Sequence, residues 1–365
     1  MKKTVLALAA IAASSAAFAQ SSVTLYGVVD ASVESVKGDK TFTRVSSDNL
    51  ASSRIAFKGV EDLGGGLKAT FLLDASLKTD TGAADSSRFF GRSAYVGLTG
   101  GFGEVRLGRQ DSLIGAQGAA ALGTQAYDEL VVARTLAGVA YRRLDNAVTY
   151  IAPTLVPGLT LAAQYTTAAE AITDTANAEA TYGDNSGRGY GLSANYANGP
   201  FAAGLSYIQV NRADSASGDV ENTGILAYGS YDLGVAKLTA YYNQDGRDGA
   251  FDNRQVYGLK AAFPVAQAVT LSAGYAFVKN ANASPVTSSA LANTASVTFA
   301  GDNVKDDNAR ILTLKAQYDL SKRTALYALF TAVNNGDNAA LNVSQVETSA
   351  GKSSRGLAVG VRHSF

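Results

Sequence analysis

The residues on which most enzymes depend are scarce in this chain. There is no Cys and a single His, His363, so disulfides, thiolate nucleophiles and cysteine-based metal sites are excluded. A Ser-His-Asp triad needs an accessible His, and a His-based metal site usually needs more than one. Residues 351–353 resemble the end of a phosphate-binding loop, but Val346 stands where that motif needs its first glycine. Residues 245–249 resemble a calcium loop only loosely, and their composition favours a tight polar turn. We therefore expect no catalytic residue, no cofactor and no metal.

The chemistry that remains available is electrostatic, and arginines carry it. Alternation of apolar and polar residues puts Arg54, Arg92 and Arg143 on the polar side of their segments; for Arg143 the parity is counted back from Val148 and Tyr150. Arginine stays charged at any physiological pH. Fixed charges on a narrow water-filled passage filter solutes by charge and size. The plainer alternative for each arginine is a solvated charge at a rim.

Alternation with a period of two runs along the whole chain and is typical of β-strands. In the last segment Leu357, Val359, Val361, His363 and Phe365 alternate with small or polar residues. About sixteen segments of about ten residues follow this pattern, which matches the strands of an outer-membrane barrel. Tyr and Phe recur near the segment ends, where amphipathic rings suit membrane interfaces. A soluble β-sandwich is the alternative, but it would need bulkier residues on its apolar face, and many here are Ala or Gly.

The N-terminus has the pattern of a secretory signal peptide. Lys2 and Lys3 precede an apolar stretch, and 17–19 read Ala-Phe-Ala, so we expect residues 1–19 to be removed and 20–365 to form one barrel domain. No other stretch is long and apolar enough for a spanning helix. The formal charge is zero, with 31 basic and 31 acidic residues, which argues against a nucleic-acid partner.

The connections between segments alternate in length. Short ones include 198–200, 232–234 and 320–323, whereas longer polar stretches cover 166–187, 211–222, 280–307 and 334–353. Short turns at one end and long loops at the other are the arrangement of outer-membrane barrels.

Several stretches resemble the general porins of Gram-negative bacteria, especially the beta-proteobacterial type. They span essentially the whole chain in the right order: SSVTLYG at 21–27, SRIAFKGVEDLGGGLKA at 53–69, GRSAYVGL at 91–98, GEVRLGRQ at 103–110, AKLT at 236–239, LSKRTALY at 320–327 and GVRHSF at 360–365.

The resemblance implies a 16-stranded antiparallel transmembrane β-barrel, usually a homotrimer, whose third long loop folds into the lumen. That loop would be about 111–139, and it carries the carboxylates expected to oppose the wall arginines: Asp128 and Glu129, with Asp111 and the inward Asp74 beside them. An ordinary exposed loop is the alternative. Arg54, Arg92 and Arg143 match the wall arginines of the family.

The terminal Phe365 resembles the family's signal for the barrel-assembly machinery, and it also ends an outward apolar row. We expect a bacterial outer-membrane protein in contact with lipid and lipopolysaccharide. Its expected function is a water-filled channel for small hydrophilic solutes and ions. A substrate-selective channel for anions or organic acids is the first alternative, and a barrel serving as an adhesin or an enzyme is the second.

Overall fold

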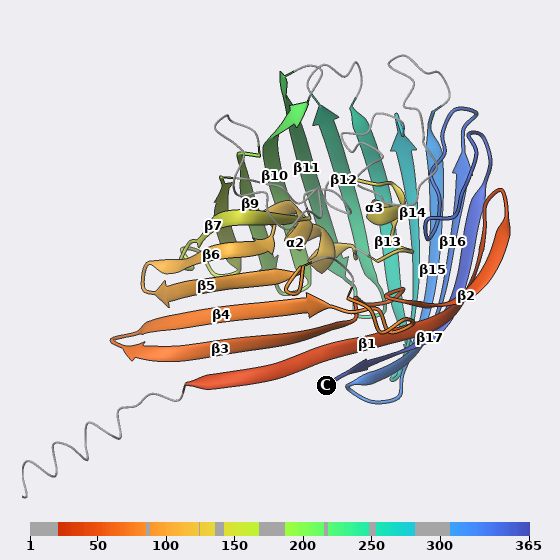
Figure 1. Ribbon diagram of the computed structural model, residues 1–365. Coiled ribbons are helices and arrows are strands. Elements are labelled where there is room, and N and C mark those ends of the chain that lie inside the picture. Colours follow the sequence, from red (N-terminus) through yellow and green to blue (C-terminus); the bar gives the residue numbers. More distant parts are fainter. Residues whose placement is uncertain are drawn as a thin grey trace, which may run out of the picture.

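The computed structural model describes residues 21–84, 88–123, 125–135, 142–167, 187–214, 218–247, 253–281 and 307–365. The expected signal peptide lies outside these residues. Strands dominate the fold (Figure 1): β1 Ser22–Lys37, β2 Thr41–Ser47, β3 Arg54–Gly64, β4 Leu67–Ser76, β5 Ser93–Gly100, β6 Gly103–Asp111, β7 Arg143–Ile151, β8 Leu159–Thr166, β9 Gly189–Asn198, β10 Phe201–Asp214, β11 Gly218–Asp232, β12 Lys237–Arg247, β13 Arg254–Ala266, β14 Val269–Lys279, β15 Ala309–Asp319, β16 Thr324–Asn335 and β17 Ser354–Ser364.

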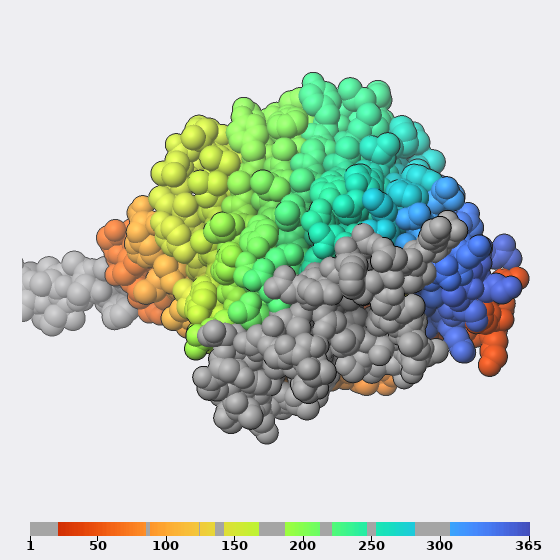
Figure 2. All heavy atoms as spheres, turned by 90° about the horizontal axis from the view of Figure 1, so that it is seen from above, coloured from red at the N-terminus to blue at the C-terminus, as the bar shows by residue number. Residues whose placement is uncertain are grey.

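These strands form one closed antiparallel sheet with sixteen positions. From β3 onwards each strand pairs with the next in sequence, β1 pairs with both β2 and β3, and β17 returns to pair with β1. Strands β2 and β3 share one position, because residues 31–37 of β1 pair with β2 and residues 22–28 pair with β3. Seen from above, the blue C-terminal strands lie beside red N-terminal residues at one edge of the wall (Figure 2). The predicted 16-stranded antiparallel barrel is therefore confirmed.

Closure involves the last residue of the chain. The backbone N–H of Gly27 donates to the carbonyl of Phe365 at 3.1 Å, and the N–H of Phe365 donates to the carbonyl of Gly27 at 3.1 Å. A Cβ on Gly27 would lie 2.3 Å from the Cζ of the Phe365 ring. Gly27 therefore leaves room for the terminal ring, an arrangement by which an aromatic side chain covers a strand glycine.

The two faces of the wall differ as the alternation predicts. Large apolar side chains such as Leu259 (65% exposed) and Val359 (57% exposed) lie on the outside. Polar residues such as Asn243, Thr331 and Glu34 are fully buried on the opposite face. An apolar outer band around a polar interior is the signature of a barrel in a membrane. Neither helix of the described chain is long and apolar enough to cross a membrane.

One local expectation about connections was wrong. Residues 211–222 were expected to form a long loop, but β10 continues to Asp214 and β11 begins at Gly218. The polar composition of this stretch hid two strands that run beyond the apolar band. The short strand β2 was not anticipated. It forms because residues 41–47 turn back and pair with residues 31–37 of β1.

Two helices follow β6. Helix α2, Leu113–Ala121, begins after Ser112, whose hydroxyl accepts the N–H of Gly115 at 3.0 Å, and α3 spans Glu129–Val132. Helix α2 contacts β8, β9, β10 and β11, and α3 contacts β14 and β15. The segment 112–135 thus extends from one side of the sheet towards the other (Figure 1).

Candidate pore constriction

A cavity of about 540 Å³ lies beside the segment 112–135. Its basic lining residues fall into two groups. We call Arg54, Arg92 and Arg142 the arginine wall, and Lys237, Lys260 and Lys315, from β12, β13 and β15, the lysine wall. The carboxylates that line it are Asp111 and Asp128. With six cations against two carboxylates, the described lining carries excess positive charge.

The arginine wall is held by neighbouring strands. Arg92 Nε lies 3.2 Å from Asp74 Oδ2, and the Arg92 N–H donates to the Asp74 carbonyl at 3.1 Å. Arg54 stands at the first position of β3, and Arg142 immediately precedes β7. Asp74 does not line the cavity. It pairs with Arg92 and so orients that side chain.

Arg143 lies beside this wall, although it does not line the cavity. It stands directly opposite Asp111 in the β6–β7 pairing, with Nε 3.3 Å from Asp111 Oδ1. The register shifts between Gly108 and Gln110, and Asn146 has a left-handed backbone with φ 47°. The alternation between inward and outward side chains is therefore interrupted between Val148 and Arg143. A count of alternate residues along this strand cannot anticipate such an irregularity.

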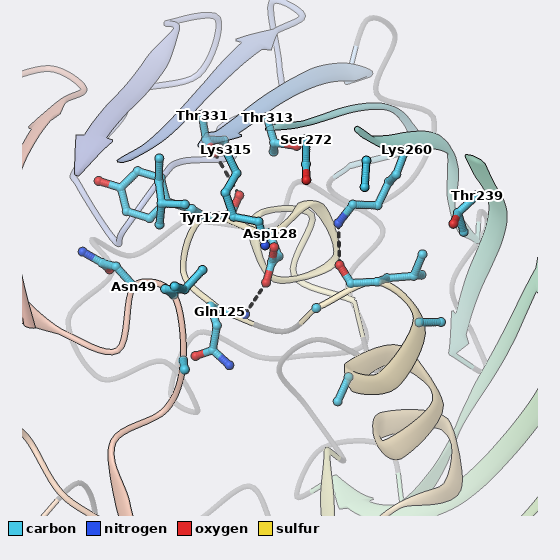
Figure 3. A pocket seen from close by; sticks show the side chains of 18 of the residues that line it. Asn49, Gln125, Tyr127, Asp128, Thr239, Lys260, Ser272, Thr313, Lys315 and Thr331 are labelled. Atoms are coloured by element: carbon cyan, nitrogen blue, oxygen red, sulfur yellow. Dashed lines mark hydrogen bonds between the residues drawn. The ribbon is translucent and has the colours of Figure 1, made fainter. Parts of the chain in front are cut away.

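The lysine wall holds the segment 112–135. Lys260 Nζ lies 3.0 Å from Glu129 Oε2 and donates to the Leu122 carbonyl at 2.5 Å, while the Thr313 hydroxyl donates to Glu129 Oε1 at 2.5 Å. Glu129 is 1% exposed. The Glu129 carboxylate is thus neutralised in place, whereas Asp128 beside it reaches the cavity. Lys260 and Lys315 extend from the strands towards Asp128 (Figure 3).

Burial raises the pKa of the Asp128 carboxyl, and the positive charge of Lys260 opposes that rise. The N–H of Gln125 also donates to Asp128 Oδ2 at 2.8 Å. This carboxyl should therefore accept a proton at a higher pH than an ordinary aspartate.

A second cluster ties the segment to β1. The buried Glu34 accepts hydrogen bonds from Tyr127 OH at 3.0 Å, Asn49 Nδ2 at 3.1 Å and Arg44 Nε at 2.5 Å. The Ser344 hydroxyl, from the connection between β16 and β17, also donates to it at 3.0 Å. One carboxylate thus joins β1, β2, the segment 112–135 and a loop. Burial raises the pKa of the Tyr127 hydroxyl, which favours its role as a neutral donor.

Glycines on the strands make room for the segment. A Cβ on Gly274 would lie 1.8 Å from Glu129 Oε1, and one on Gly356 would lie 2.8 Å from Tyr127 OH. Arg254 is 1% exposed and donates to the carbonyls of Ala133 and Arg134 at 2.9 and 2.6 Å. The far end of the segment is therefore fixed as well.

The structure brings together four of the residues expected from the sequence, since Arg54, Arg92, Asp111 and Asp128 line one cavity. Asp74, Arg143 and Glu129 stand beside it as ion-pair partners. The lysine wall and Arg142 were missed. Lys237, Lys260 and Lys315 share the polar parity of their strands, which is the same signal that singled out Arg54.

A polar, positively lined cavity inside a closed barrel defines a membrane channel. The sequence model of the Gram-negative porins matches residues 5–338, and the chain belongs to that family. It is 32% identical to outer membrane porin protein 32 of Delftia acidovorans and 31% identical to an outer membrane porin protein of Bordetella pertussis, with all of each chain covered. The structure of an anion-selective porin from Comamonas acidovorans superposes with a TM-score of 0.77 at 29% identity, covering 95% of this chain and all of that one.

The chain is thus an outer-membrane porin, and the passive channel expected from its sequence is confirmed. The outer membrane protein OmpT of Vibrio cholerae, at 15% identity and a TM-score of 0.64, shares the fold. The described residues contain no group of His, Cys, Asp and Glu that could hold a metal ion.

Proposed function

We propose that this porin prefers small anions, and that its selectivity arises where the arginine and lysine walls face each other. The observation that carries the proposal is the composition of the cavity, which six cationic and two acidic side chains line. An excess of fixed positive charge at a narrow point lowers the energy of an anion there and raises that of a cation. The similarity to an anion-selective porin supports the same direction.

We propose that the segment 112–135 occupies the lumen and narrows it. The hydrogen bonds of Glu129, Tyr127 and Leu122 to Thr313, Glu34 and Lys260 support this position, because these partners belong to different strands of the wall. In this arrangement Arg54, Arg92, Asp111 and Asp128 act on the permeating solute directly. Asp74, Arg143 and Glu129 orient them or hold the segment.

The assembly that we propose is a homotrimer in the outer membrane, with one pore in each protomer and lipopolysaccharide among its lipid neighbours. The signal at 1–19 would direct export, and Phe365 would serve the barrel-assembly machinery. We assign the protein no catalytic activity, because the charged side chains that line its cavity are explained by their selection of solutes according to charge.

The test compares three solutes of nearly equal size that differ in charge: glucose, gluconate and glucosamine. Uptake into liposomes containing the porin is measured, with a potassium ionophore present to dissipate any charge imbalance. We expect gluconate to enter fastest and glucosamine slowest. Equal rates for the three would remove the charge preference and leave an unselective pore; faster entry of glucosamine would reverse the proposal.

A further inference from the structure

The inner face of the barrel carries an apolar patch on the short-turn side of the arginine wall. Strands β1, β3, β4 and β5 lie side by side (Figure 1). In the pairing of these strands Lys58 stands opposite Leu72, and Leu72 stands opposite Tyr95. Leu72 lies two residues from Asp74, the partner of Arg92, so it shares that inward face of β4.

Tyr26 of β1 completes the patch. It stands opposite Ala56, which lies two residues from Lys58 on the same face of β3. The Lys58 ammonium lies over the Tyr26 ring, with Nζ 5.5 Å from the ring centroid. Two phenol rings and a leucine thus surround one lysine on the face that is polar in most such barrels.

The patch is open to the lumen. Tyr26, Leu72 and Tyr95 are partly exposed, and Lys58 is exposed. The helices of the segment 112–135 contact β8 to β11, β14 and β15, so they dock on other parts of the wall. Within the described chain neither Tyr26 OH nor Tyr95 OH has a hydrogen-bond partner, whereas outer-face tyrosines such as Tyr242 donate to neighbouring glutamines. Apolar surface and two hydroxyls therefore remain available to a solute.

One cation of the patch has no acidic partner. Arg106 also lies over a tyrosine, with Cζ 5.1 Å from the Tyr95 ring centroid, but its Nε and Nη2 donate to Glu104 at 2.7 and 2.9 Å. Lys58 has no ion pair among the described residues. Arg54, four residues from Lys58 on the same face of β3, lines the cationic cavity. An anion leaving the cavity on this side therefore meets a free ammonium group beside apolar surface.

We propose that Tyr26, Lys58, Leu72 and Tyr95 form a binding site for small aromatic carboxylates. The ring of the solute lies against Leu72 between the two tyrosines, where it buries apolar surface and packs edge-to-face or offset against their rings. Its carboxylate pairs with the Lys58 ammonium. The site rests on the proposed anion preference for the delivery of its ligand, and it narrows that preference to anions that carry a ring.

The experiment titrates para-fluorobenzoate with the folded, full-length protein in a non-ionic detergent and follows binding by fluorine NMR. K58Q should lower the affinity about fivefold, the effect of one charge about 4 Å away in water. L72T should lower it by a similar factor, because it removes much of the apolar contact. The matched control K68Q removes another exposed lysine from the inward face of β4, four residues from Leu72, and should bind as the parent does.

Competing solutes separate the ring from the charge. Benzoate should displace the probe, whereas acetate has the charge without the ring and benzamide has the ring without the charge. Each of these two should need a concentration at least about fivefold higher. Displacement by acetate or benzamide as readily as by benzoate would overturn the site. Equal losses in K58Q and K68Q, or an unchanged affinity in L72T, would also overturn it.

The zero-current potential of the parent under a salt gradient tests the charge preference separately. Anion preference without binding of the probe would overturn the aromatic site and leave the channel proposal standing. Binding that depends on Lys58 and Leu72, in a parent that does not prefer anions, would overturn the charge preference and leave the site standing.

Discussion

The two charged walls of the cavity are built differently. On the arginine wall, Arg92 pairs with Asp74 from the adjacent strand, so both partners belong to the barrel itself. On the lysine wall, Lys260 pairs with Glu129 from the segment 112–135. Cations of the first kind keep their position whether or not the segment is docked. The Lys260 side chain both lines the cavity and holds the segment, so it couples the position of the segment to the charge of the cavity.

The largest effect should follow from breaking the lysine-wall ion pair. K260M leaves the Glu129 carboxylate buried without its cation, which should lower the free energy of unfolding by about 3 kcal/mol, the lower end for one removed partner of a buried pair. The double variant E129Q/K260M should recover most of the loss, because no buried charge remains. Denaturant titration of the refolded barrel measures both.

The matched control is K315M, on the same wall but without an ion pair among the described residues. It should change the stability by about 0.5 kcal/mol or less, as usual for partly exposed sites. If K260M and K315M were equally mild, the Lys260–Glu129 pair would not hold the segment.

A smaller effect should follow from filling the space that Gly274 leaves. In G274A the new methyl group would press on Glu129 Oε1, which lies 1.8 Å from the position of a Cβ. The segment should move away from the wall and towards the pore axis, so single-channel conductance should fall. G191A is the control, because the nearest atom, the Tyr207 carbonyl oxygen, lies at an ordinary 3.4 Å. Identical conductance of G274A and G191A would show that docking against this wall does not set the pore width.

The smallest effect concerns pH. Because burial raises the pKa of Asp128, this carboxylate should be neutralised at a higher pH than an ordinary aspartate, whose pKa is about 3.9. Loss of a negative charge from a positively lined cavity strengthens anion preference, so the preference should rise as the pH falls, and the rise should begin at a higher pH than an ordinary aspartate would give. D128N should have the stronger anion preference wherever the parent carboxylate is charged, and it should lose this pH dependence. D232N, at the exposed last residue of β11, should keep it.

The strands were predictable because their signal is local. Alternation in residues such as Leu357, Val359 and Val361 reports directly which side faces lipid, and the structure confirms these as exposed. The same parity marked Lys260 and Lys315 as polar-face residues. What alternation could not supply was their height in the barrel, and hence that they meet Arg54 across one cavity.

Other features depended on contacts between distant parts of the chain. Glu34 lies 93 residues from Tyr127 and 310 from Ser344 in sequence, yet it accepts hydrogen bonds from both. No local pattern indicates such a meeting. The irregularity at Gly108 and Asn146 likewise has no clear sequence signal. The alternation used to place Arg143 is interrupted there, so it could not establish which way the side chain points. The structure places that side chain next to Asp111.

The most direct test of the central claim is the zero-current potential of single channels in a planar bilayer under a salt gradient. It compares the parent with R54Q, K315Q and the double variant. The account predicts anion preference for the parent and a reduction of the anion-to-cation permeability ratio by up to about 30-fold in each single variant, because one charge about 4 Å away in water shifts the energies of the anion and the cation by about 1 kcal/mol each in opposite directions. The double variant should show a larger reduction. A cation-preferring parent, or a ratio that neither substitution changes, would contradict the claim that the two facing walls select the charge of the solute.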